Sequence, residues 1–338
     1  MTLRIGINGF GRIGRNVFRA AAARGEDLEI VAVNDLGDAA TMAHLLAHDS
    51  VLGRFPGEVA AETTAEGGVI RAGDARFTVL AERDPAALPW GVLGVDVVIE
   101  STGVLTDAAR ARAHVDGGAK KVLIAAPATG EDVTIVLGVN DDTYDPERHT
   151  VISNASCTTN CLGVLAKVLH DAVGIDSGMM TTVHAYTQDQ NLQDAPHQDP
   201  RRARAAALNV VPTSSGAAKA IGLVLPELRG RLDALAFRVP VPTGSVTDLT
   251  VTTLRPTTAE EVKQAYAEAA AGAYRGLLTY SEAPLVSTDI VADPASCVFD
   301  APLTRVLGSQ VKVVGWYDNE WGYANRLIDL ALRVGATL

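Results

Sequence analysis

The first 155 residues alternate between patterns typical of strands and patterns typical of helices. Residues 3–7 (LRIGI) form an apolar run that predicts a strand, and the glycine-rich stretch 9–14 follows it directly. Apolar residues then recur at helical spacing until Gly25, which predicts the end of a helix. Residues 28–34 (LEIVAVN) predict a second strand. A strand–turn–helix–strand unit of this kind pairs its two strands in parallel.

The same alternation continues as far as residue 127. Residues 38–48 have a helical pattern, and shorter strand-like pieces lie within 69–80. The nearly continuous apolar run at 95–100 is typical of a strand that is covered on both faces. A helical pattern at 106–116 and a strand-like run at 121–127 follow. This order predicts a doubly wound domain with a parallel sheet.

The pattern changes after residue 155. SNASCTTNC (153–161) leads into an apolar helical segment, and a strand-like run follows at 179–186. Residues 187–216 form a long irregular polar segment, and a loop of this length inside a compact domain is usually functional. The remaining predictions are strands at 232–242, 245–254 and 310–318, a helix near 258–272 and a final helix after the last strand. A chain of 338 residues suits two domains, because it is too long for one ordinary hydrophobic core.

The charge balance narrows the class of protein. Lys and Arg total 29 and Asp and Glu total 40, so the formal net charge is −11. An acidic balance argues against binding to nucleic acid or to an anionic membrane, since both need a basic surface. No apolar run approaches the roughly 18–20 residues that span a bilayer, and no secretory signal pattern is visible. The three cysteines are too few for a disulfide framework, so a cytoplasmic, reduced protein is expected.

The glycine-rich stretch indicates a nucleotide site. Gly9, Gly11 and Gly14 fit G-x-G-x-x-G, in which the glycines allow a tight turn, close approach to a pyrophosphate and close helix–strand packing. The following helix would present its N-terminus to the phosphates. Asp35 ends the next strand, 21 positions after Gly14, where a carboxylate can bind a ribose hydroxyl instead of being a solvated turn residue. That carboxylate would repel a 2′-phosphate, which favours NAD over NADP.

The cysteines allow several interpretations. Cys157, Cys161 and the seven scattered histidines show no compact metal-ligand spacing, so no metal site is expected. Cys161 lies in an apolar helical pattern and, like Cys297, is interpreted as a buried small residue. Cys157 lies at the predicted first turn of a helix, where the dipole favours the thiolate. His184, at the end of a predicted strand, could hold that thiolate as an ion pair, although spacing alone does not bring the two together.

Three classes of function compete at this point. A cysteine hydrolase would need no dinucleotide. A thiol-dependent aldehyde oxidation needs both parts, because the thiol converts an aldehyde into a hemithioacetal that can surrender hydride. The glycine pattern favours this second class. A nucleotide-sensing binding protein without catalysis is the third, and an unreactive thiol would favour it.

Six stretches of the chain together resemble the phosphorylating, NAD-dependent glyceraldehyde-3-phosphate dehydrogenases. They are INGFGRIGRN, SNASCTTNC, TTVHAYTQDQ, RRARAAALNVVPTSSGAAKA, RVPVPTGSVTDL and WYDNEWGYANR. The likeness runs in order along essentially the whole chain. It implies oxidation of D-glyceraldehyde 3-phosphate to 1,3-bisphosphoglycerate, with a thiohemiacetal and then a thioester on Cys157 and with His184 as acid and base. Erythrose-4-phosphate dehydrogenase, which shares the cysteine motif, is the nearest alternative.

The resemblance also implies the remaining site residues. Those expected for the substrate phosphate are Thr187, Asp189 and Arg238. Those expected for the attacking inorganic phosphate are Ser156, Thr158, Arg202, Ser215 and Gly216. Those expected for the cofactor, besides the three glycines and Asp35, are Arg12 and Ile13 at the pyrophosphate, Arg83 near the adenine, and Thr102 and Asn319 towards the nicotinamide.

The fold that the resemblance implies has two domains and a homotetrameric assembly. Residues 1–155 would form a Rossmann-type doubly wound parallel sheet, completed by a C-terminal helix at 320–338. Residues 156–319 would form an α+β catalytic domain with a mixed, largely antiparallel sheet. The partners implied are small molecules, glyceraldehyde 3-phosphate and inorganic phosphate, together with further copies of the chain.

Overall fold

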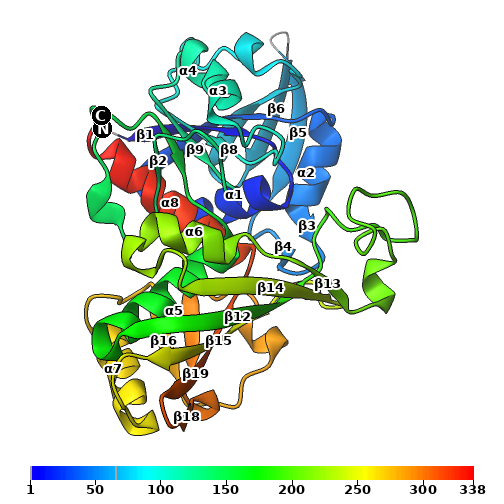
Figure 1. The fold of residues 1–338 in the computed structure, drawn as a ribbon. Coiled ribbons are helices and arrows are strands. Elements are labelled where there is room, and N and C mark those ends of the chain that lie inside the picture. The colour runs from blue at the N-terminus through cyan, green and yellow to red at the C-terminus, as the bar shows by residue number, and fades with distance from the viewer. Residues whose placement is uncertain (1, 65–66) are drawn as a thin grey trace. The chain divides into compact units, whose positions relative to one another are not determined.

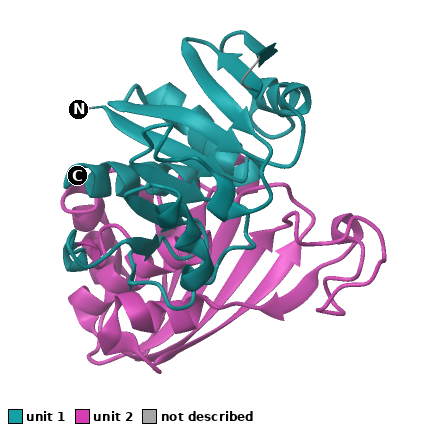
Figure 2. Cartoon of the chain, turned by 90° about the horizontal axis from the view of Figure 1, so that it is seen from above, with its two compact units in different colours: residues 1–135, 142–155, 324–338 teal, residues 136–141, 156–323 magenta. Residues whose placement is uncertain are grey.

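The computed structural model describes residues 2–64 and 67–338, which form two compact units (Figure 2). Unit 1 holds the described residues up to Ile135, together with Asp142–Ala155 and Ala324–Leu338. Unit 2 holds Val136–Asp141 and Ser156–Tyr323. The domain boundaries expected from the sequence remain a prediction, and these units differ from them at residues 136–141 and 320–323.

Unit 1 contains a nine-stranded sheet among its described residues, in the order β10–β11–β9–β8–β1–β2–β7–β6–β5 (Figure 1). The strands from β10 to β7 pair in parallel, whereas β5 and β6 add antiparallel pairs at one edge. Their bounds are β1 (Leu3–Asn8), β2 (Leu28–Asn34), β5 (Val59–Thr64), β6 (Gly67–Ala72), β7 (Ala75–Leu80), β8 (Val97–Glu100), β9 (Lys121–Ile124), β10 (Val133–Thr134) and β11 (Val151–Ser153). Parallel strands of this kind carry their ligands at their carboxyl ends.

The helices of unit 1 cover both faces of this sheet (Figure 1). Helix α1 (Arg12–Arg24) buries Val17 and Phe18 and ends at Gly25, whose φ of 63° is the left-handed conformation of a helix C-cap. Helix α2 (Ala39–Ala47) begins at Asp38, whose side chain accepts a hydrogen bond from the Thr41 N–H. The short helices α3 (Ala108–Ala111) and α4 (Ala113–Asp116) lie on the opposite face from α1.

The C-terminal helix α8 (Trp321–Gly335) joins unit 1 from Ala324 onwards. Arg24 of α1 forms an ion pair of 2.6 Å with Asp329, and its guanidinium also lies 3.3 Å from the Asn325 side-chain oxygen. The core beneath α1 contains an aromatic cluster in which the rings of Phe18 and Phe77 lie 4.9 Å apart. Burial of such rings, together with the buried apolar strands, stabilises the sheet that carries the nucleotide site.

Unit 2 contains a mixed sheet in the order β13–β14–β12–β15–β19–β17–β16, with β18 paired to β19. Two pairs, β12–β14 and β16–β17, are parallel, and the others are antiparallel. The strands are β12 (Ile175–Ala185), β13 (Val211–Ser214), β14 (Leu232–Val239), β15 (Ser245–Thr253), β16 (Leu278–Ser281), β17 (Cys297–Asp300), β18 (Arg305–Leu307) and β19 (Gln310–Tyr317). Strand β15 alternates buried and half-buried residues, as expected of a sheet with one covered face.

Helix α5 (Cys157–Val173) is the central helix of unit 2, and twelve of its residues are buried. It contacts the sheet strands β15, β17 and β19 and the helices α6 (Ala217–Val224) and α7 (Ala259–Ala271). Tyr266 of α7 stacks on Phe299 at 3.9 Å and donates a 2.6 Å hydrogen bond to the Leu165 carbonyl. Such dense packing holds the first turn of α5, and with it Cys157, in one position.

The structure agrees with the predicted fold class, and it differs from the predicted elements in several places. The helix expected at 106–116 is divided into α3 and α4 at Arg112. The segment expected to be irregular at 187–216 contains β13, which pairs with β14. Helix α6 and the strands β5, β10, β11, β16, β17 and β18 have no predicted counterpart. Each has eight residues or fewer, which is too short for a clear periodic pattern even where the element is buried, as β17 is.

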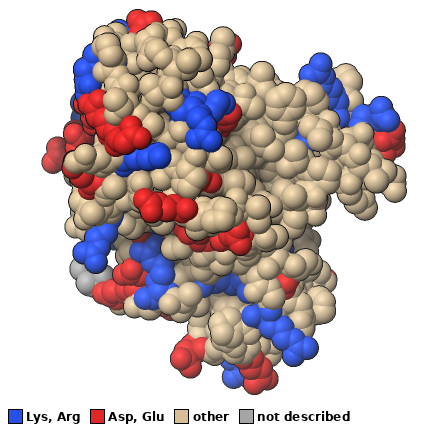
Figure 3. Space-filling view, turned by 90° about the horizontal axis from the view of Figure 1, so that it is seen from below, with Lys and Arg blue, Asp and Glu red and all other residues tan. Residues whose placement is uncertain are grey.

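Charged side chains of both signs are interspersed on the face of the molecule that Figure 3 shows, with broad uncharged areas between them. Several form exposed ion pairs, such as Arg204–Asp194 at 2.8 Å. Pairs of this kind contribute about 0–1 kcal/mol each. Within the described parts of the chain, no helix is long and apolar enough to cross a membrane.

Candidate active site

The turn between β1 and α1 in unit 1 has the form of a phosphate cradle. Gly9 has a φ of 92°, and a Cβ there would lie 2.6 Å from the Thr102 backbone nitrogen. A Cβ on Gly14 would lie 2.2 Å from the Gly9 carbonyl oxygen, so only glycine fits. A Cβ on Gly11, in contrast, would face open space. The backbone is therefore tight on its inner side and open where a pyrophosphate would approach.

The first turn of α1 adds a helix N-terminus to this cradle. Arg12 and Ile13 occupy that turn, where backbone N–H groups point out along the helix axis. The Arg12 guanidinium forms an ion pair of 2.5 Å with Asp49, which is buried. The side chain of Arg12 is thus held to the protein, and the backbone of this turn is the part that could serve a phosphate.

A pocket of about 470 Å³ lies in unit 1 beside the cradle. Asp35 lines it, and its carboxylate accepts a 2.8 Å hydrogen bond from the Phe10 N–H. Arg83 and Thr102 line the same pocket, together with Leu36. The sequence prediction placed Thr102 towards the nicotinamide. Thr102 lines the pocket together with Asp35 and Arg83, and its place towards the nicotinamide stays a prediction. These features fit a bound dinucleotide, since a carboxylate, a cradle and a concave surface meet in one unit.

In unit 2, Cys157 and His184 meet side by side. Cys157 is the first residue of α5 and is half-buried, and His184 lies near the end of β12 and is buried. The Cys157 Sγ is 3.5 Å from His184 Nε2. The His184 Nδ1 lies 2.7 Å from the Ala185 carbonyl oxygen, which can only accept a hydrogen bond. The shorter contact favours the tautomer with the ring proton on Nδ1, in which Nε2 faces the sulfur as an acceptor.

The protonation of this pair is set by opposing effects. Burial raises the pKa of the Cys157 thiol to about 11, while Arg238 and the N–H groups of the first helical turn lower it. Burial, and then Arg238, lower the pKa of His184 to about 3. Each group alone thus favours its uncharged form, and the ion pair expected from the sequence stays a prediction. The 3.5 Å contact lets the proton pass from sulfur to Nε2 without leaving the pair.

Arg238 connects the imidazole to the predicted substrate-phosphate site. It lies on β14 directly beside His184 in the parallel pair β12–β14. Its Nη1 is within 3.1 Å of His184 Nδ1 and donates to the Ala185 carbonyl and to the Thr187 hydroxyl. Its Nε is buried and has no hydrogen-bond partner among the described residues. An unpartnered buried donor of this kind is suited to an anionic ligand.

Arg202 forms a second cationic centre. Its guanidinium forms an ion pair with Asp189 and donates a 3.0 Å hydrogen bond to the Thr213 hydroxyl. Asp199 lies 3.7 Å away and also accepts from Thr213. Asp189 is therefore already paired with a cation. Sequence reasoning missed Thr213, because nothing in the local sequence shows its contact with Arg202.

The hydroxyls predicted for the attacking phosphate have partners within the protein. The Ser156 hydroxyl caps α5 by accepting from the Thr159 N–H at 3.0 Å. The Thr158 hydroxyl lies 2.9 Å from the hydroxyl of Tyr317, which sequence reasoning also missed. The Ser215 hydroxyl accepts a 3.3 Å hydrogen bond from the Ala217 N–H, and Gly216 is the N-cap of α6. Among the described residues, neither Ser215 nor Gly216 forms a hydrogen bond with Cys157 or His184.

Asn319 lies in unit 2 directly after β19 and is buried. Its side-chain oxygen accepts a 2.8 Å hydrogen bond from the Ser245 hydroxyl and lies 3.4 Å from the Thr243 hydroxyl. These contacts fix the amide, so that its nitrogen is the group that could donate to a ligand. Among the residues that the structure describes, no cluster of three or more His, Cys, Asp or Glu side chains could hold a metal ion.

The parallel sheet, the glycine cradle and the adjoining pocket define a dinucleotide-binding protein of the Rossmann class. The comparisons with known proteins agree. The family model described as the NAD binding domain of glyceraldehyde 3-phosphate dehydrogenase matches residues 3–108. The model described as the C-terminal domain of the same enzyme matches residues 156–319.

Relatives of known name are similar along the whole chain. Glyceraldehyde-3-phosphate dehydrogenase 1 of Streptomyces avermitilis is 84% identical over 338 residues, covering all of both chains. Glyceraldehyde-3-phosphate dehydrogenase 2 of Streptomyces arenae is 82% identical, again over all of both chains. The enzyme of Mycolicibacterium smegmatis is 62% identical over an alignment of 344 residues, also with full coverage. The chain belongs to the glyceraldehyde-3-phosphate dehydrogenase family. The family, the fold class and the NAD cofactor expected from the sequence are thereby confirmed.

Proposed function

We propose that Cys157 and His184 carry out, in this chain, the oxidative phosphorylation of D-glyceraldehyde 3-phosphate to 1,3-bisphosphoglycerate with reduction of NAD. The observation that carries this proposal is the 3.5 Å contact between Sγ and Nε2, with Arg238 beside the same imidazole. The family supplies the class of reaction. The contacts support the roles that we propose for the residues.

The first step forms a bond between sulfur and the aldehyde carbon. His184 Nε2 accepts the thiol proton, and the thiolate adds to the carbonyl carbon. The developing oxyanion can be held by the Cys157 backbone N–H and by the newly protonated Nε2–H, and a donor of this kind can be worth about 3 kcal/mol. The oxyanion then takes the proton from Nε2, which gives a thiohemiacetal and restores the neutral imidazole.

The second step converts the thiohemiacetal into a thioester. Bound NAD supplies a hydride acceptor. His184 Nε2 takes the hydroxyl proton of the thiohemiacetal as the carbon–hydrogen bond breaks, so the carbonyl re-forms on the same carbon. Nδ1 stays bonded to the Ala185 carbonyl throughout and keeps the ring orientation fixed.

The third step is attack by inorganic phosphate. The phosphate oxygen adds to the thioester carbon, and the carbon–sulfur bond breaks to release the acyl phosphate and the Cys157 thiolate. His184 returns its proton to the sulfur. We assign Arg238, with Thr187 and Asp189, to the phosphate of the substrate. The attacking phosphate is assigned to Arg202 and to the backbone near Ser156, Thr158, Ser215 and Gly216.

The residues of unit 1 that would hold the dinucleotide have separate roles. Gly9, Gly11 and Gly14, with the Arg12 and Ile13 backbone, would bind the pyrophosphate. Asp35 would accept from the ribose hydroxyls and repel a 2′-phosphate, Arg83 would lie near the adenine, and Thr102 would line the same pocket. The Asn319 amide, fixed by Ser245, would orient the nicotinamide.

Two expectations about the whole protein also belong to this proposal. We propose a homotetramer and a cytoplasmic location, on the basis of the family resemblance. Light scattering coupled to size-exclusion chromatography would give four times the 35.3 kDa chain mass for a tetramer. A single chain mass at micromolar concentration would contradict it.

The reaction is tested by measuring initial NADH formation with glyceraldehyde 3-phosphate, with and without inorganic phosphate, beside an erythrose 4-phosphate arm. Phosphate-dependent turnover of the triose, lost in Cys157→Ser, supports the proposal. The matched control is Cys161→Ser, one turn along the same helix, which should retain turnover. Turnover of the tetrose alone would assign the chain to the erythrose-4-phosphate enzyme. Nucleotide binding without turnover of either substrate would reject catalysis.

A further inference from the structure

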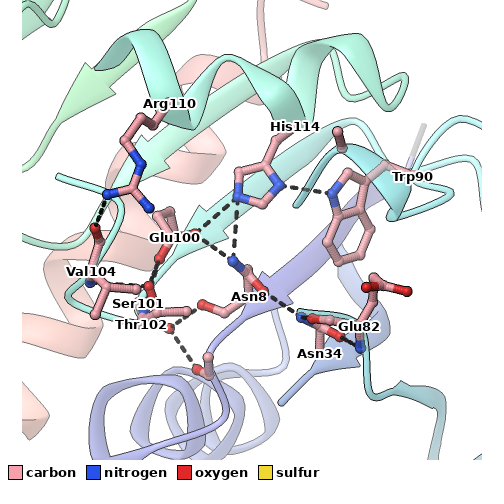
Figure 4. A network of polar contacts seen from close by, with 12 residues as sticks. Asn8, Asn34, Glu82, Trp90, Glu100, Ser101, Thr102, Val104, Arg110 and His114 are labelled. Carbon is pink, nitrogen blue, oxygen red and sulfur yellow. Dashed lines mark hydrogen bonds and ion pairs between the residues drawn. The ribbon is translucent and has the colours of Figure 1, made fainter. Parts of the chain in front are cut away.

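Five buried side chains form a continuous chain of polar contacts beside the pocket of unit 1 (Figure 4). This buried polar chain consists of Trp90, His114, Glu100, Asn8 and Asn34, none of which is more than 5% exposed. No step of the proposed reaction uses Trp90, His114 or Glu100. Groups buried this deeply must be partnered, so their arrangement is specific.

The direction of the hydrogen bonds follows from Trp90. Its indole nitrogen can only donate, and it lies 3.0 Å from His114 Nδ1. Nδ1 is therefore the acceptor, and Nε2 carries the ring proton. Nε2 lies 2.9 Å from Glu100 Oε2 and donates to it. The Asn8 amide nitrogen donates to the same oxygen at 2.6 Å.

The other Glu100 oxygen holds a wall of the nucleotide pocket. Oε1 accepts a 2.8 Å hydrogen bond from the Thr102 N–H and a short one from the Thr102 hydroxyl. Thr102 in turn packs against Gly9, and the neighbouring Ser101 hydroxyl donates to the Gly9 carbonyl at 2.7 Å. The position of Glu100 thus sets both the Thr102 turn and the glycine turn.

The buried polar chain also continues through Asn8 and Asn34 to other residues that line the pocket. Asn8 Oδ1 accepts a 2.7 Å hydrogen bond from the Asn34 amide nitrogen. Asn34 then bonds the backbone of Glu82 twice, accepting from its N–H at 2.8 Å and donating to its carbonyl at 2.9 Å. Glu82 precedes Arg83, and both line the pocket. One carboxylate therefore connects the loops that follow β1, β7 and β8.

We propose that Glu100 is a positioning residue for the nucleotide, which acts through Thr102 and Asn8 without touching the ligand. Glu100 accepts from four donors, and within the described residues no Lys or Arg pairs with it. A buried carboxylate without a cation costs stability, which an apolar core would avoid. Glu100 lies at the carboxyl end of β8, where it can hold the residues that line the nucleotide pocket in place. This inference rests on the proposed use of NAD.

Glu100→Gln tests the proposal, because an amide cannot satisfy all four donors. His114 Nε2 and the Asn8 amide are obligate donors, so the glutamine oxygen must face them. The glutamine nitrogen then faces Thr102, whose hydroxyl can turn to accept but whose backbone N–H cannot. The variant therefore breaks one defined bond, between Glu100 and the Thr102 backbone.

The readout is nucleotide affinity by calorimetry, with NAD and with ADP-ribose, which lacks the nicotinamide. We expect both dissociation constants to rise about tenfold, as for the loss of one well-placed hydrogen bond. The KM for NAD should rise with them, whereas kcat at saturating NAD and alkylation of Cys157 should stay within about twofold. Glu29→Gln, an exposed carboxylate of β2 in the same unit, is the control and should change none of these. Unchanged dissociation constants, or weaker binding of NAD without weaker binding of ADP-ribose, would overturn the proposal.

Two substitutions of His114 provide a second test in case Glu100→Gln fails to fold. His114→Gln retains a donor near the Nε2 position, whereas His114→Leu has similar volume and no donor. The leucine variant should weaken ADP-ribose and NAD binding about tenfold, and the glutamine variant should stay within about threefold of the parent. Equal weakening in both, or none in either, would assign the buried polar chain a structural role only. Because calorimetry needs no turnover, this result is independent of whether the triose is the substrate.

Discussion

At the scale of single residues, the reactivity of Cys157 depends on the base beside it. We expect His184→Asn to slow alkylation of Cys157 by iodoacetamide at least about tenfold near neutral pH, because burial then keeps the pKa of the thiol raised with no acceptor for its proton. Because the pKa is raised, only a small fraction of the thiol is ionised near neutral pH. As the pH is increased towards that pKa, the thiolate fraction and the alkylation rate of the variant should rise about tenfold per pH unit. The parent should show a shallower dependence, since the proton can move to Nε2.

The control for this measurement is His44→Asn, an exposed histidine of α2 in the other unit. In this control variant, Cys157 should be alkylated at the same rate as in the parent. An unaltered rate in His184→Asn would show that the imidazole does not activate the sulfur.

Asp35 offers a second test at this scale. Replacing Asp35 with glycine should raise the KM for NAD and increase the ratio of NADP to NAD turnover, because the carboxylate that would repel a 2′-phosphate is gone. The change also removes an acceptor for the Phe10 N–H, so some loss of affinity for both cofactors is expected. Asp38→Asn, three residues on, keeps its helix-capping role and should leave the ratio unchanged. A constant NADP to NAD ratio in Asp35→Gly would contradict the assignment.

At the scale of elements, the start of α5 depends on its N-cap. The Ser156 hydroxyl accepts from the Thr159 N–H and also contacts the Thr159 hydroxyl at 2.7 Å. Ser156→Ala should lower the free energy of unfolding by about 1 kcal/mol, as measured by urea denaturation, whereas Ser156→Thr should retain most of it. A loss of phosphate affinity in Ser156→Ala without loss of stability would mean that the hydroxyl serves the ligand instead.

The Arg12–Asp49 ion pair joins α1 to the hairpin of β3 (His48–Asp49) and β4 (Gly53–Arg54). Its contribution to stability should depend on pH. Burial alone would raise the pKa of Asp49, but the N–H groups of Leu52 and Val51 and the guanidinium of Arg12 outweigh it and lower the pKa. A carboxyl with a depressed folded-state pKa stabilises the protein above its unfolded-state pKa, and that stability is lost as the pH falls. Asp49→Asn should therefore cost about 1–3 kcal/mol at pH 7.

The free energies of unfolding of Asp49→Asn and of the parent should become more similar below about pH 4, where the Asp49 carboxyl of the parent takes up its proton. Urea unfolding at both pH values measures this, with the exposed Asp74→Asn as the control. A difference that does not change with pH would contradict the account of Asp49.

The elements that the sequence predicted well are those with a strong period and clear ends. Strand β2 has the predicted bounds, and α1 ends before Gly25 as expected. The predictions failed where tertiary pairing decides the structure. Strand β13 contains Pro212 and has little apolar pattern, and it becomes a strand only because β14 lies beside it. Such non-local pairing leaves no local signal.

At the scale of the whole molecule, the same distinction separates the parts of the site. The glycine turn and Asp35 follow a local spacing rule, so they could be found without a structure. The contact of Cys157 with His184 joins residues 27 positions apart and depends on α5 packing against the sheet. Tyr317 and Thr213 lie in stretches that resemble the family, but nothing local shows their contacts, and the buried Glu100–His114 pair lies outside those stretches. Their roles depend on neighbours from distant strands, which only the folded chain brings together.

The central claim is that the aldehyde carbon becomes a thioester on Cys157 that only phosphate releases efficiently. The measurement that tests it most directly is rapid mixing of the NAD-loaded enzyme with glyceraldehyde 3-phosphate in the absence of phosphate. A burst of NADH close to one equivalent per functional site, followed by slow turnover that phosphate accelerates, is the predicted result. Cys157→Ser should give no burst. Steady NADH formation without a burst, at a rate indifferent to phosphate, would contradict the account.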